Sequence, residues 1–141
     1  MAAEELARLS LPADHDHLVA LMEFVGGQAQ AAGLDPQTLF RVDLAAEEIL
    51  TNIIKYAYPQ GEEGMVEVAC GVRGGSFVME FRDQGRPFDP LAVDEPELSE
   101  DLRLRPVGGL GIHLVRQVME RVSYHRQGQT NLLKVAKALP A

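Results

Sequence analysis

The chain has 141 residues, 46% of them hydrophobic, with a formal net charge of −8 and one cysteine, Cys70. This length suits a single domain with one core, and the negative charge argues against direct nucleic-acid binding, which needs clustered Lys and Arg. A lone cysteine excludes an internal disulfide, and no apolar run is long enough to cross a membrane. The first residues are acidic and lack the pattern of a signal peptide, so we expect a cytoplasmic protein.

The first half of the chain predicts one strand and two helices. Alternation near the start is typical of an edge strand. Asp14 and Asp35 are favourable helix N-caps, and Gly33 is of the residue type that commonly ends helices. The expected elements are a strand at 5–11, a helix that follows the Asp14 cap and runs to about 32, and a helix at 36–56.

The second half predicts two hairpins on either side of a third helix. Gly74 and Gly75 mark one tight turn, and Gly128 marks the other. The order of elements predicts an α+β fold, a two-layer α/β sandwich in which three helices cover one face of a mostly antiparallel mixed sheet. The expected elements are strands at 65–72 and 76–82, a helix at 112–121, and strands at 122–126 and 131–138.

A carboxylate and an amide lie inside the second predicted helix. Glu48 and Asn52 are four residues apart, so they occupy one side of the helix, one turn apart, beside the apolar stripe of Ile49 and Ile53. The simpler interpretation is a solvated helix flank. The functional interpretation is a magnesium site, because an amide oxygen suits Mg²⁺ and a carboxylate can act as a base near a reacting phosphate.

A turn sequence follows the first predicted hairpin. In the stretch RDQGRPFDP, Asp83 closes a strand and Gly85 comes two residues later. Both residue types are common in turns, which is the simpler interpretation. The alternative is a carboxylate that accepts a hydrogen bond from an adenine amino group, with Gly85 leaving room for the base. The spacing alone leaves both interpretations open.

Three glycines, Gly108, Gly109 and Gly111, precede the third predicted helix in the stretch GGLGIHLVRQV. Unpaired N–H groups at a helix start suit phosphate, although a flexible hinge is the simpler interpretation. The pattern lacks the third glycine of a dinucleotide-binding fingerprint and the Gly-Lys-Ser/Thr of a Walker A loop. The preceding segment, 91–107, is long for a loop in a compact domain, which favours either disorder or a lid over a nucleotide.

Two histidines near the start, His15 and His17, belong to a residue type that binds metals. Residues two apart do not share a helix face, and the neighbouring Asp14 and Asp16 are explained by capping and by the helix dipole. We therefore expect no metal site at this position.

In this order the three motifs resemble those of the GHKL ATPase superfamily. EEILTNIIKYAY resembles its N-box, DQGRPFDP its G1 box and GGLGI its G2 box. Within the superfamily, the chain is most similar to small stand-alone anti-sigma-factor serine kinases of bacterial stress and sporulation switches, over nearly its whole length. The resemblance implies a Bergerat-type ATP-binding fold and one histidine-kinase-like ATPase domain over 1–141, with an ATP lid at about 91–107.

The resemblance also implies roles for individual residues. Glu48 would be the general base for an attacking serine hydroxyl, and Asn52 would bind the Mg²⁺ that bridges the phosphates of ATP. Asp83 would bind the adenine amino group, with Gly85 permitting its close approach. The expected phosphate-facing residues are Gly109, Leu110 and Gly111, while Arg105 and Arg103 would either reach phosphate from the lid or only balance its acidic residues.

The function implied by the resemblance is that of an ATP- and Mg²⁺-dependent protein-serine/threonine kinase that acts as an anti-sigma factor. Its partners would be a sigma factor and an antagonist protein that it phosphorylates, and it would form a homodimer. Two departures from the family pattern are visible: Tyr56 stands where the N-box often has His, and the G2 box lacks some glycines. The alternative is a non-catalytic ATP-binding module that sequesters or activates a partner.

Overall fold

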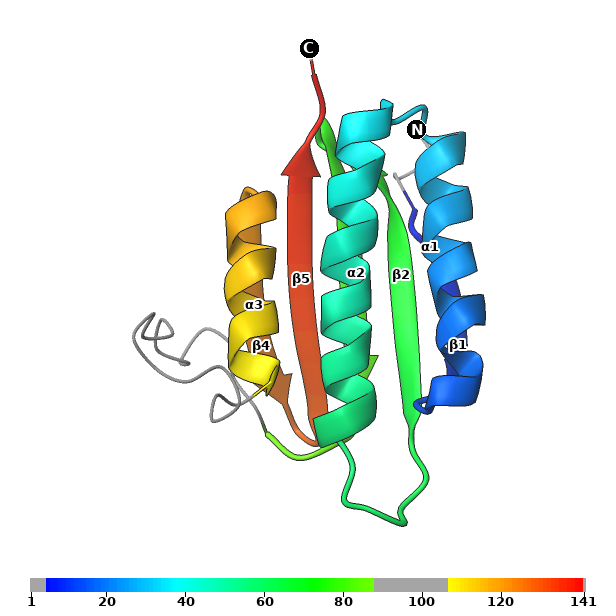
Figure 1. Ribbon diagram of the computed structural model, residues 1–141, viewed down its shortest axis with the longest axis vertical. Helices are drawn as coiled ribbons and strands as arrows, with labels where there is room; N and C mark the ends of the chain where they lie inside the picture. The colour runs from blue at the N-terminus through cyan, green and yellow to red at the C-terminus, as the bar shows by residue number, and fades with distance from the viewer. Residues whose placement is uncertain (1–4, 88–106, 141) are drawn as a thin grey trace.

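The computed structural model describes residues 5–87 and 107–140, which form two layers (Figure 1). One layer is a five-stranded sheet and the other is helical, so the predicted α+β sandwich is confirmed. The strands are β1 (Ala7–Pro12), β2 (Met65–Arg73), β3 (Ser76–Asp83), β4 (Arg121–Gln127) and β5 (Thr130–Ala138). The helices are α1 (Leu18–Ala31), preceded by the 3-10 turn η1 (His15–His17), α2 (Pro36–Tyr56) and α3 (Val107–Val118).

The strands lie in the order β1-β2-β3-β5-β4, and every pairing between the described strands is antiparallel. The sheet therefore has no parallel component within 5–87 and 107–140. All three helices lie on one face of the sheet, with α2 in the middle (Figure 1). The described helices leave the opposite face uncovered, and charged side chains stand on it.

Capping residues set where the first two helices begin and end. Asp14 accepts a hydrogen bond from the His17 backbone N–H at 3.1 Å, and Asp35 accepts one from the Thr38 N–H at 3.2 Å. After α1, Gly33 adopts a φ of +78°, the left-handed conformation in which many helices end. The predicted caps are confirmed, except that the Asp14 cap starts η1, which leads into α1.

The hairpin between β2 and β3 turns at Gly74 and Gly75, whose φ values are +59° and +77°. Positive φ at two successive positions is the type I′ turn that two-residue hairpins favour. Together with the pairing of β3 and β5, this hairpin places Asp83 directly beside Asn131 of β5. The predicted hairpin is confirmed, and it positions the end of β3.

The core lies between the helices and the sheet. Strand residues two apart and helix residues three or four apart supply its side chains, as the two periods require. Each large apolar side chain that is buried contributes about 1.5–3 kcal/mol. The fully buried side chains include Phe77, Met79 and Phe81 of β3 and Val42, Ile49 and Leu50 of α2.

Cys70 of β2 belongs to this core and is completely buried. Burial raises the pKa of its thiol to about 12, so it stays protonated at neutral pH. It is a small apolar core residue, as predicted.

Helix α3 begins and ends earlier than the sequence predicts. It runs from Val107 to Val118, so the boundaries predicted at 112–121 are wrong. Each glycine disfavours a helix by about 1 kcal/mol, which is why the glycine-rich stretch 108–111 indicated a loop. Packing of α3 against α2, with Val115 fully buried in the core, outweighs that local preference. The glycine-rich stretch therefore lies inside the first turns of α3 and not ahead of it.

The residues that the structure describes contain no group of three or more His, Cys, Asp or Glu side chains able to hold a metal ion. His17 instead contacts the Asp14 carboxylate through Nδ1 at 2.6 Å, and this hydrogen bond lowers the pKa of that carboxyl group. Along 5–87 and 107–140, no helix combines the length and the apolar character needed to span a membrane.

Candidate functional site

A pocket opens between the C-terminal half of α2 and strands β3, β4 and β5. It holds about 470 Å³ of empty space, including its open mouth. Mostly apolar walls with a few polar groups are the usual character of a small-molecule site. The lining residues are Ile49, Asn52, Ile53, Tyr56, Ala57, Phe81, Asp83, Arg86, Tyr124, Asn131 and Leu133.

Asn52 of α2 lines this pocket with an amide side chain. It is only 8% exposed, and its buried amide nitrogen Nδ2 has no hydrogen-bond partner among the described residues. Leaving a buried amide group unpaired costs about 1–3 kcal/mol, so such groups are rare unless a ligand or an ion satisfies them. The simpler interpretation of Asn52, a solvated helix flank, is therefore wrong, and its position fits a binding role.

Asp83 closes β3 and also lines the pocket, with 5% of its surface exposed. Its Oδ1 accepts hydrogen bonds from the Gly85 backbone N–H at 2.8 Å and from Nδ2 of Asn131 at 2.9 Å. Its Oδ2 accepts none from the part of the chain that the structure describes. One carboxylate oxygen is held by the protein, and the other can accept a hydrogen bond from a ligand amino group.

The glycine at position 85 is required by packing within the protein. A Cβ there would lie 2.2 Å from the backbone oxygen of Ala57, at the end of α2. The Arg86 backbone N–H donates to that same oxygen at 2.8 Å, and the Arg86 Nε donates to the Tyr56 oxygen at 2.8 Å. These bonds satisfy carbonyls that the helix end leaves unpaired. They also hold the turn after β3 against α2. Asn52 of α2 and Asp83 of β3 therefore line the same pocket.

A polar cluster on β4 and β5 holds the same turn, and sequence reasoning missed it. Asn131 donates through Nδ2 to Asp83, and its Oδ1 accepts from the Tyr124 hydroxyl. Nη1 of Arg126 also donates to Oδ1 of Asn131, at 3.1 Å, and to the Gly85 backbone oxygen at 2.7 Å. The carboxylate at the end of β3 therefore has a fixed orientation.

One signal could have revealed this cluster in the sequence. Asn131 alternates with Leu133 and Val135, which are buried core residues of β5. A polar residue at a core-facing strand position needs a hydrogen-bond partner. The sequence does not say which partner, because Asp83 is 48 residues away.

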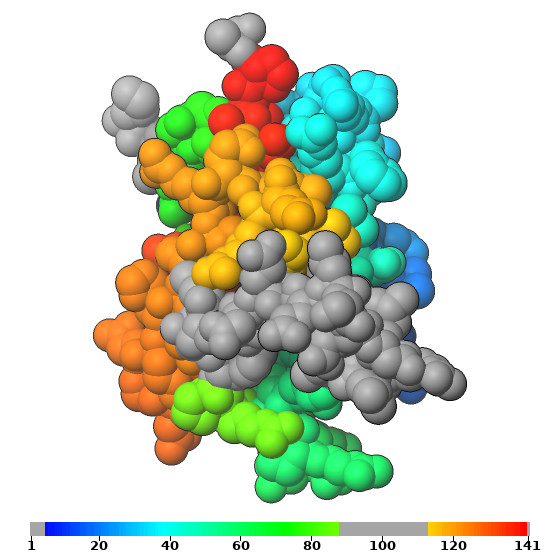
Figure 2. All heavy atoms as spheres, turned by 60° about the vertical axis from the view of Figure 1, so that its left-hand side comes forward, coloured from blue at the N-terminus to red at the C-terminus, as the bar shows by residue number. Residues whose placement is uncertain are grey.

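Tyr58 connects the loop after α2 to the sheet. Its hydroxyl donates to the Met65 oxygen at 2.6 Å and accepts from the Gln84 N–H at 2.9 Å. Burial raises the pKa of this hydroxyl, so it stays protonated and able to donate. Figure 2 shows the two connected segments side by side, in two shades of green, at one end of the molecule.

Glu48 is absent from the described residues that line the pocket. It lies one turn before Asn52 and is partly buried. With about 100° per residue, the pocket side of α2 is centred between Asn52 and Ile53, so Glu48 stands at its margin. The spacing of four placed the two residues on one side of the helix, but only Asn52 faces the pocket.

The predicted phosphate-binding stretch 109–111 lies within the first turns of α3. Figure 1 shows the start of α3 at the same end of the molecule as the end of α2. A helix N-terminus has unpaired N–H groups and the positive end of the helix dipole, and both suit phosphate. Arg103, Arg105 and the predicted lid up to residue 106 lie outside the described residues.

The polar groups of the pocket fit a nucleotide with a divalent ion. The amide of Asn52 offers an oxygen ligand of the type that Mg²⁺ binds, and its unpaired nitrogen suits a phosphate oxygen. Asp83 offers an acceptor, and Phe81 and Leu133 supply apolar wall for a planar base.

The class of domain to which the fold and the pocket belong is identified by its sequence pattern. The sequence pattern of the histidine kinase-like ATPase domain family matches residues 11–137. The chain therefore belongs to the histidine kinase-like ATPase domain family, and the resemblance to GHKL ATPases is confirmed.

The chain is similar to bacterial protein kinases over most of its length. It is 26% identical over 125 residues to serine-protein kinase RsbW of Listeria innocua, covering 85% of this chain and 80% of that protein. It is 29% identical over 94 residues to serine/threonine-protein kinase BtrW of Bordetella bronchiseptica, covering 67% of this chain and 66% of that protein.

A solved structure shares the fold. The RsbU and RsbW domains of Rv1364c from Mycobacterium tuberculosis superpose on this chain with a TM-score of 0.68 at 12% identity. The match covers 95% of this chain and 32% of that longer one. At such low identity the likeness establishes the architecture alone.

Proposed function

We propose that this protein is an ATP- and Mg²⁺-dependent protein-serine/threonine kinase that acts as an anti-sigma factor in a partner-switching pathway. The observation that carries the proposal is that one pocket of a histidine kinase-like ATPase domain holds both Asn52 and Asp83. Among the described residues, the buried Nδ2 of Asn52 has no hydrogen-bond partner and Oδ2 of Asp83 accepts no hydrogen bond. The similarity to RsbW and BtrW, which are named as protein kinases, supports the same class of reaction.

In this proposal the pocket residues bind the nucleotide at two points. Asn52 would hold Mg²⁺, and Asp83 would accept a hydrogen bond from the adenine amino group. The unpaired N–H groups at the start of α3, up to that of Gly109, would face the phosphates. Bound ATP and Mg²⁺ would supply the phosphoryl group and neutralise its charge. Since phosphoryl transfer depends mainly on positioning, a pocket with fixed walls is the main contribution of the protein.

Glu48 would act as the general base that takes the proton of the substrate hydroxyl. It lies one turn from Asn52 at the margin of the pocket and is partly exposed to solvent. A protein substrate approaches from solvent, so its serine hydroxyl would arrive at this margin. A carboxylate there is within the region where proton transfer would occur.

The position of Glu48 also favours a second candidate function, a non-catalytic ATP-binding module that sequesters or activates a partner. Nucleotide binding would use Asn52 and Asp83, which both line the pocket. Asp83 is the one carboxylate among the described lining residues, and it is engaged by the protein through Oδ1. Such a module would bind ATP without transferring phosphate.

Phosphate transfer separates the two candidates. The purified protein is incubated with labelled ATP, Mg²⁺ and antagonist proteins recovered from the native host by pull-down with this chain. The kinase predicts labelled serine or threonine on an antagonist, whereas ATP binding without any transfer favours the module.

Replacement of the proposed base sharpens this test. Glu48→Ala is expected to bind ATP normally and to lower transfer by about 100-fold or more, the usual contribution of a general base. Glu47→Ala, at the exposed neighbouring position of α2, is the matched control and is expected to keep full transfer. Transfer by Glu48→Ala at nearly the wild-type rate would remove Glu48 from the catalytic role.

The proposed partners are a sigma factor and the antagonist protein, and the proposed state is a cytoplasmic homodimer. The net charge of −8 favours docking to basic patches on a sigma factor. Sedimentation of the chain alone and with each recovered partner, at low and at high salt, measures both the self-association and the charge dependence.

A further inference from the structure

We propose that Asn131 is a positioning residue for the nucleotide: it holds the Asp83 carboxylate so that Oδ2 is presented to the pocket, and it thereby sets the preference for adenine. This inference rests on the proposed ATP-binding function. It assigns a role to a residue of β5 that belongs to none of the three sequence motifs.

Two donors determine which way the Asn131 amide points. The Tyr124 hydroxyl and Nη1 of Arg126 both donate to Oδ1, and a guanidinium group cannot accept. The opposite end of the amide is therefore the NH₂ group, which meets Oδ1 of Asp83 at 2.9 Å and the Arg86 backbone oxygen at 2.9 Å. A flipped amide would oppose donor to donor at one end and acceptor to acceptor at the other.

The backbone geometry makes this contact selective for one carboxylate oxygen. Asp83 and Asn131 are paired residues on adjacent antiparallel strands, so the sheet fixes the distance between their backbones. Asn131 is 6% exposed, which leaves its amide little freedom. Oδ1 of Asp83 is bound by Asn131 and by the Gly85 N–H, and no described residue donates to Oδ2, which can therefore meet a ligand.

A carboxylate oxygen that can only accept selects a base with an amino group. Adenine presents an amino group at the position where guanine presents a carbonyl oxygen, and a carbonyl would face the carboxylate acceptor to acceptor. A site built around one hydrogen bond rejects an analogue that leaves its buried polar group unpaired. Rotation of the Asp83 carboxylate would weaken this selection, and Asn131 prevents that rotation.

Among the described residues, the charged and titratable groups around the Asp83–Asn131 pair come from four parts of the chain. Arg126 and Tyr124 belong to β4, Arg86 to the turn after β3, Tyr56 to α2 and Tyr58 to the loop after it. A carboxylate introduced at position 131 would add a second carboxyl group to this cluster, in contact with that of Asp83.

Asn131→Asp gives a readout that a merely structural role would not produce. In this variant two carboxylates face each other, and one shared proton restores the hydrogen bond to Oδ1 of Asp83. As the pH rises and that proton leaves, two like charges are in contact. We expect the ratio of variant to wild-type affinity for Mg-ATP to be near one at pH 5.5 and to fall roughly tenfold or more by pH 8, a factor of ten corresponding to one unit of pKa shift.

Using the ratio cancels the titration of ATP itself, which is the same for both proteins. Tyr124→Phe is the matched control, because it removes one donor to Asn131 without adding a charge. Its affinity for Mg-ATP is expected to fall by about two- to fivefold, equally at both pH values. Circular dichroism at pH 5.5 and pH 8 checks that each variant is folded.

If Asn131→Asp does not fold at pH 8, Asn131→Ser replaces it. Serine lacks the NH₂ group that contacts both Oδ1 of Asp83 and the Arg86 backbone oxygen, so the ratio of ATP to GTP affinity is expected to fall roughly tenfold at all pH values. A pH-independent affinity ratio for folded Asn131→Asp, or an unchanged ATP preference for Asn131→Ser, would overturn the positioning role while leaving the proposed function intact. Absence of ATP binding by the wild type would overturn both the positioning role of Asn131 and the proposed function.

Discussion

Two buried carboxylates on one strand have opposite surroundings. Glu80 is 3% exposed and Asp83 is 5% exposed, and both belong to β3. Because they are three residues apart, they point to opposite faces of the sheet. Asp83 faces the helices and the pocket, whereas Glu80 lies on the face that the described helices leave uncovered.

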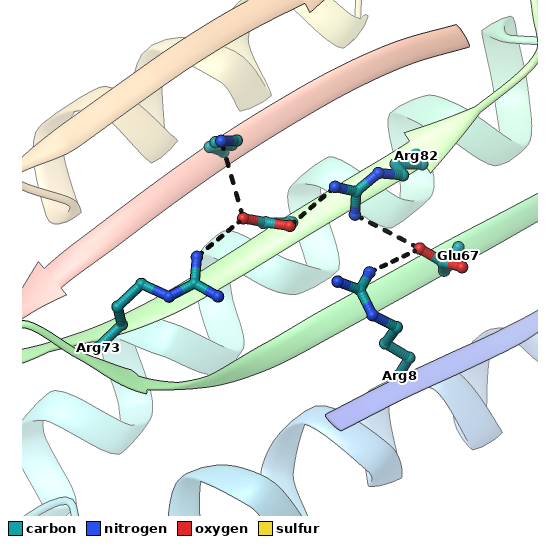
Figure 3. A network of polar contacts seen from close by, with 6 residues as sticks. Arg8, Glu67, Arg73 and Arg82 are labelled. Carbon is teal, nitrogen blue, oxygen red and sulfur yellow. Dashed lines mark hydrogen bonds and ion pairs between the residues drawn. The ribbon is translucent and has the colours of Figure 1, made fainter. Parts of the chain in front are cut away.

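Three cations compensate the charge of Glu80. Arg82 lies 3.0 Å from Oε1, while Arg73 and Lys134 lie 3.5 and 3.9 Å from Oε2. Arg82 also contacts Glu67 at 3.4 Å, so the network continues across β2 to β1 (Figure 3). Both oxygens of Glu80 are occupied within the protein, and its role is to hold strands together.

Asp83 receives hydrogen bonds only from neutral donors among the described residues, and no ion pair to it is present there. A buried carboxylate whose charge is not compensated is costly, so it persists where binding or catalysis requires it. Burial alone therefore does not mark a functional carboxylate. A functional carboxylate is marked by an oxygen that faces a pocket and accepts no hydrogen bond from the described residues. The contrast between Glu80 and Asp83 can be tested directly.

The largest expected effect comes from Asp83→Ala, which removes the proposed acceptor for the adenine amino group. We expect ATP affinity to fall about 100-fold, since a hydrogen bond to a charged group contributes about 1.5–3 kcal/mol, and the preference for ATP over GTP to disappear. Isothermal titration calorimetry with both nucleotides measures this. An unchanged preference for ATP over GTP would mean that the adenine base binds elsewhere. Glu80→Gln is the control and is expected to keep this preference.

A smaller effect, on stability alone, is expected from Glu80→Ala. Removing one partner of a fully buried ion pair costs about 3–5 kcal/mol, but the cations around Glu80 are 28–47% exposed, so we expect a loss of about 2 kcal/mol. Urea denaturation measures the free energy of unfolding. Nucleotide affinity should stay at the wild-type level, and its loss in a folded Glu80→Ala protein would erase the distinction between the two carboxylates.

The smallest expected change in stability is that caused by Asn52→Leu. Nδ2 of this buried amide has no partner among the described residues, so replacing the amide with an apolar side chain of similar size should raise the free energy of unfolding by about 1 kcal/mol. The same change should abolish the Mg²⁺-dependent part of ATP binding, because it removes the oxygen ligand. Thermal denaturation and calorimetry with and without Mg²⁺ measure the two effects. A destabilised protein would show that Asn52 has a structural partner.

Features set by local chemistry could be predicted from the sequence. Helix α2 begins after the Asp35 cap and ends at Tyr56, as predicted, and the β2–β3 hairpin turns at its two glycines. Asn52 and Asp83 stood out because they are polar residues at the edge of apolar patterns. The structure brings both to one pocket, although their roles toward ATP and Mg²⁺ stay predictions.

Features set by packing between distant segments could not be predicted. The start of α3 depends on its contact with α2, which outweighs the glycine preference for a loop. The contact of Asn131 with Asp83 joins two strands that are neighbours only in the folded sheet. Helical spacing placed Glu48 beside Asn52, but the width of the pocket decides which of them lines it.

The most direct test of the ATP pocket is calorimetric titration of the purified wild-type chain with ATP in the presence of Mg²⁺. We expect one ATP to bind per chain, with affinity that falls when Mg²⁺ is removed with a chelator and with much weaker binding of GTP. No measurable binding of ATP at millimolar concentration, by a chain shown to be folded, would contradict the assignment of the pocket between α2 and β3 to a nucleotide.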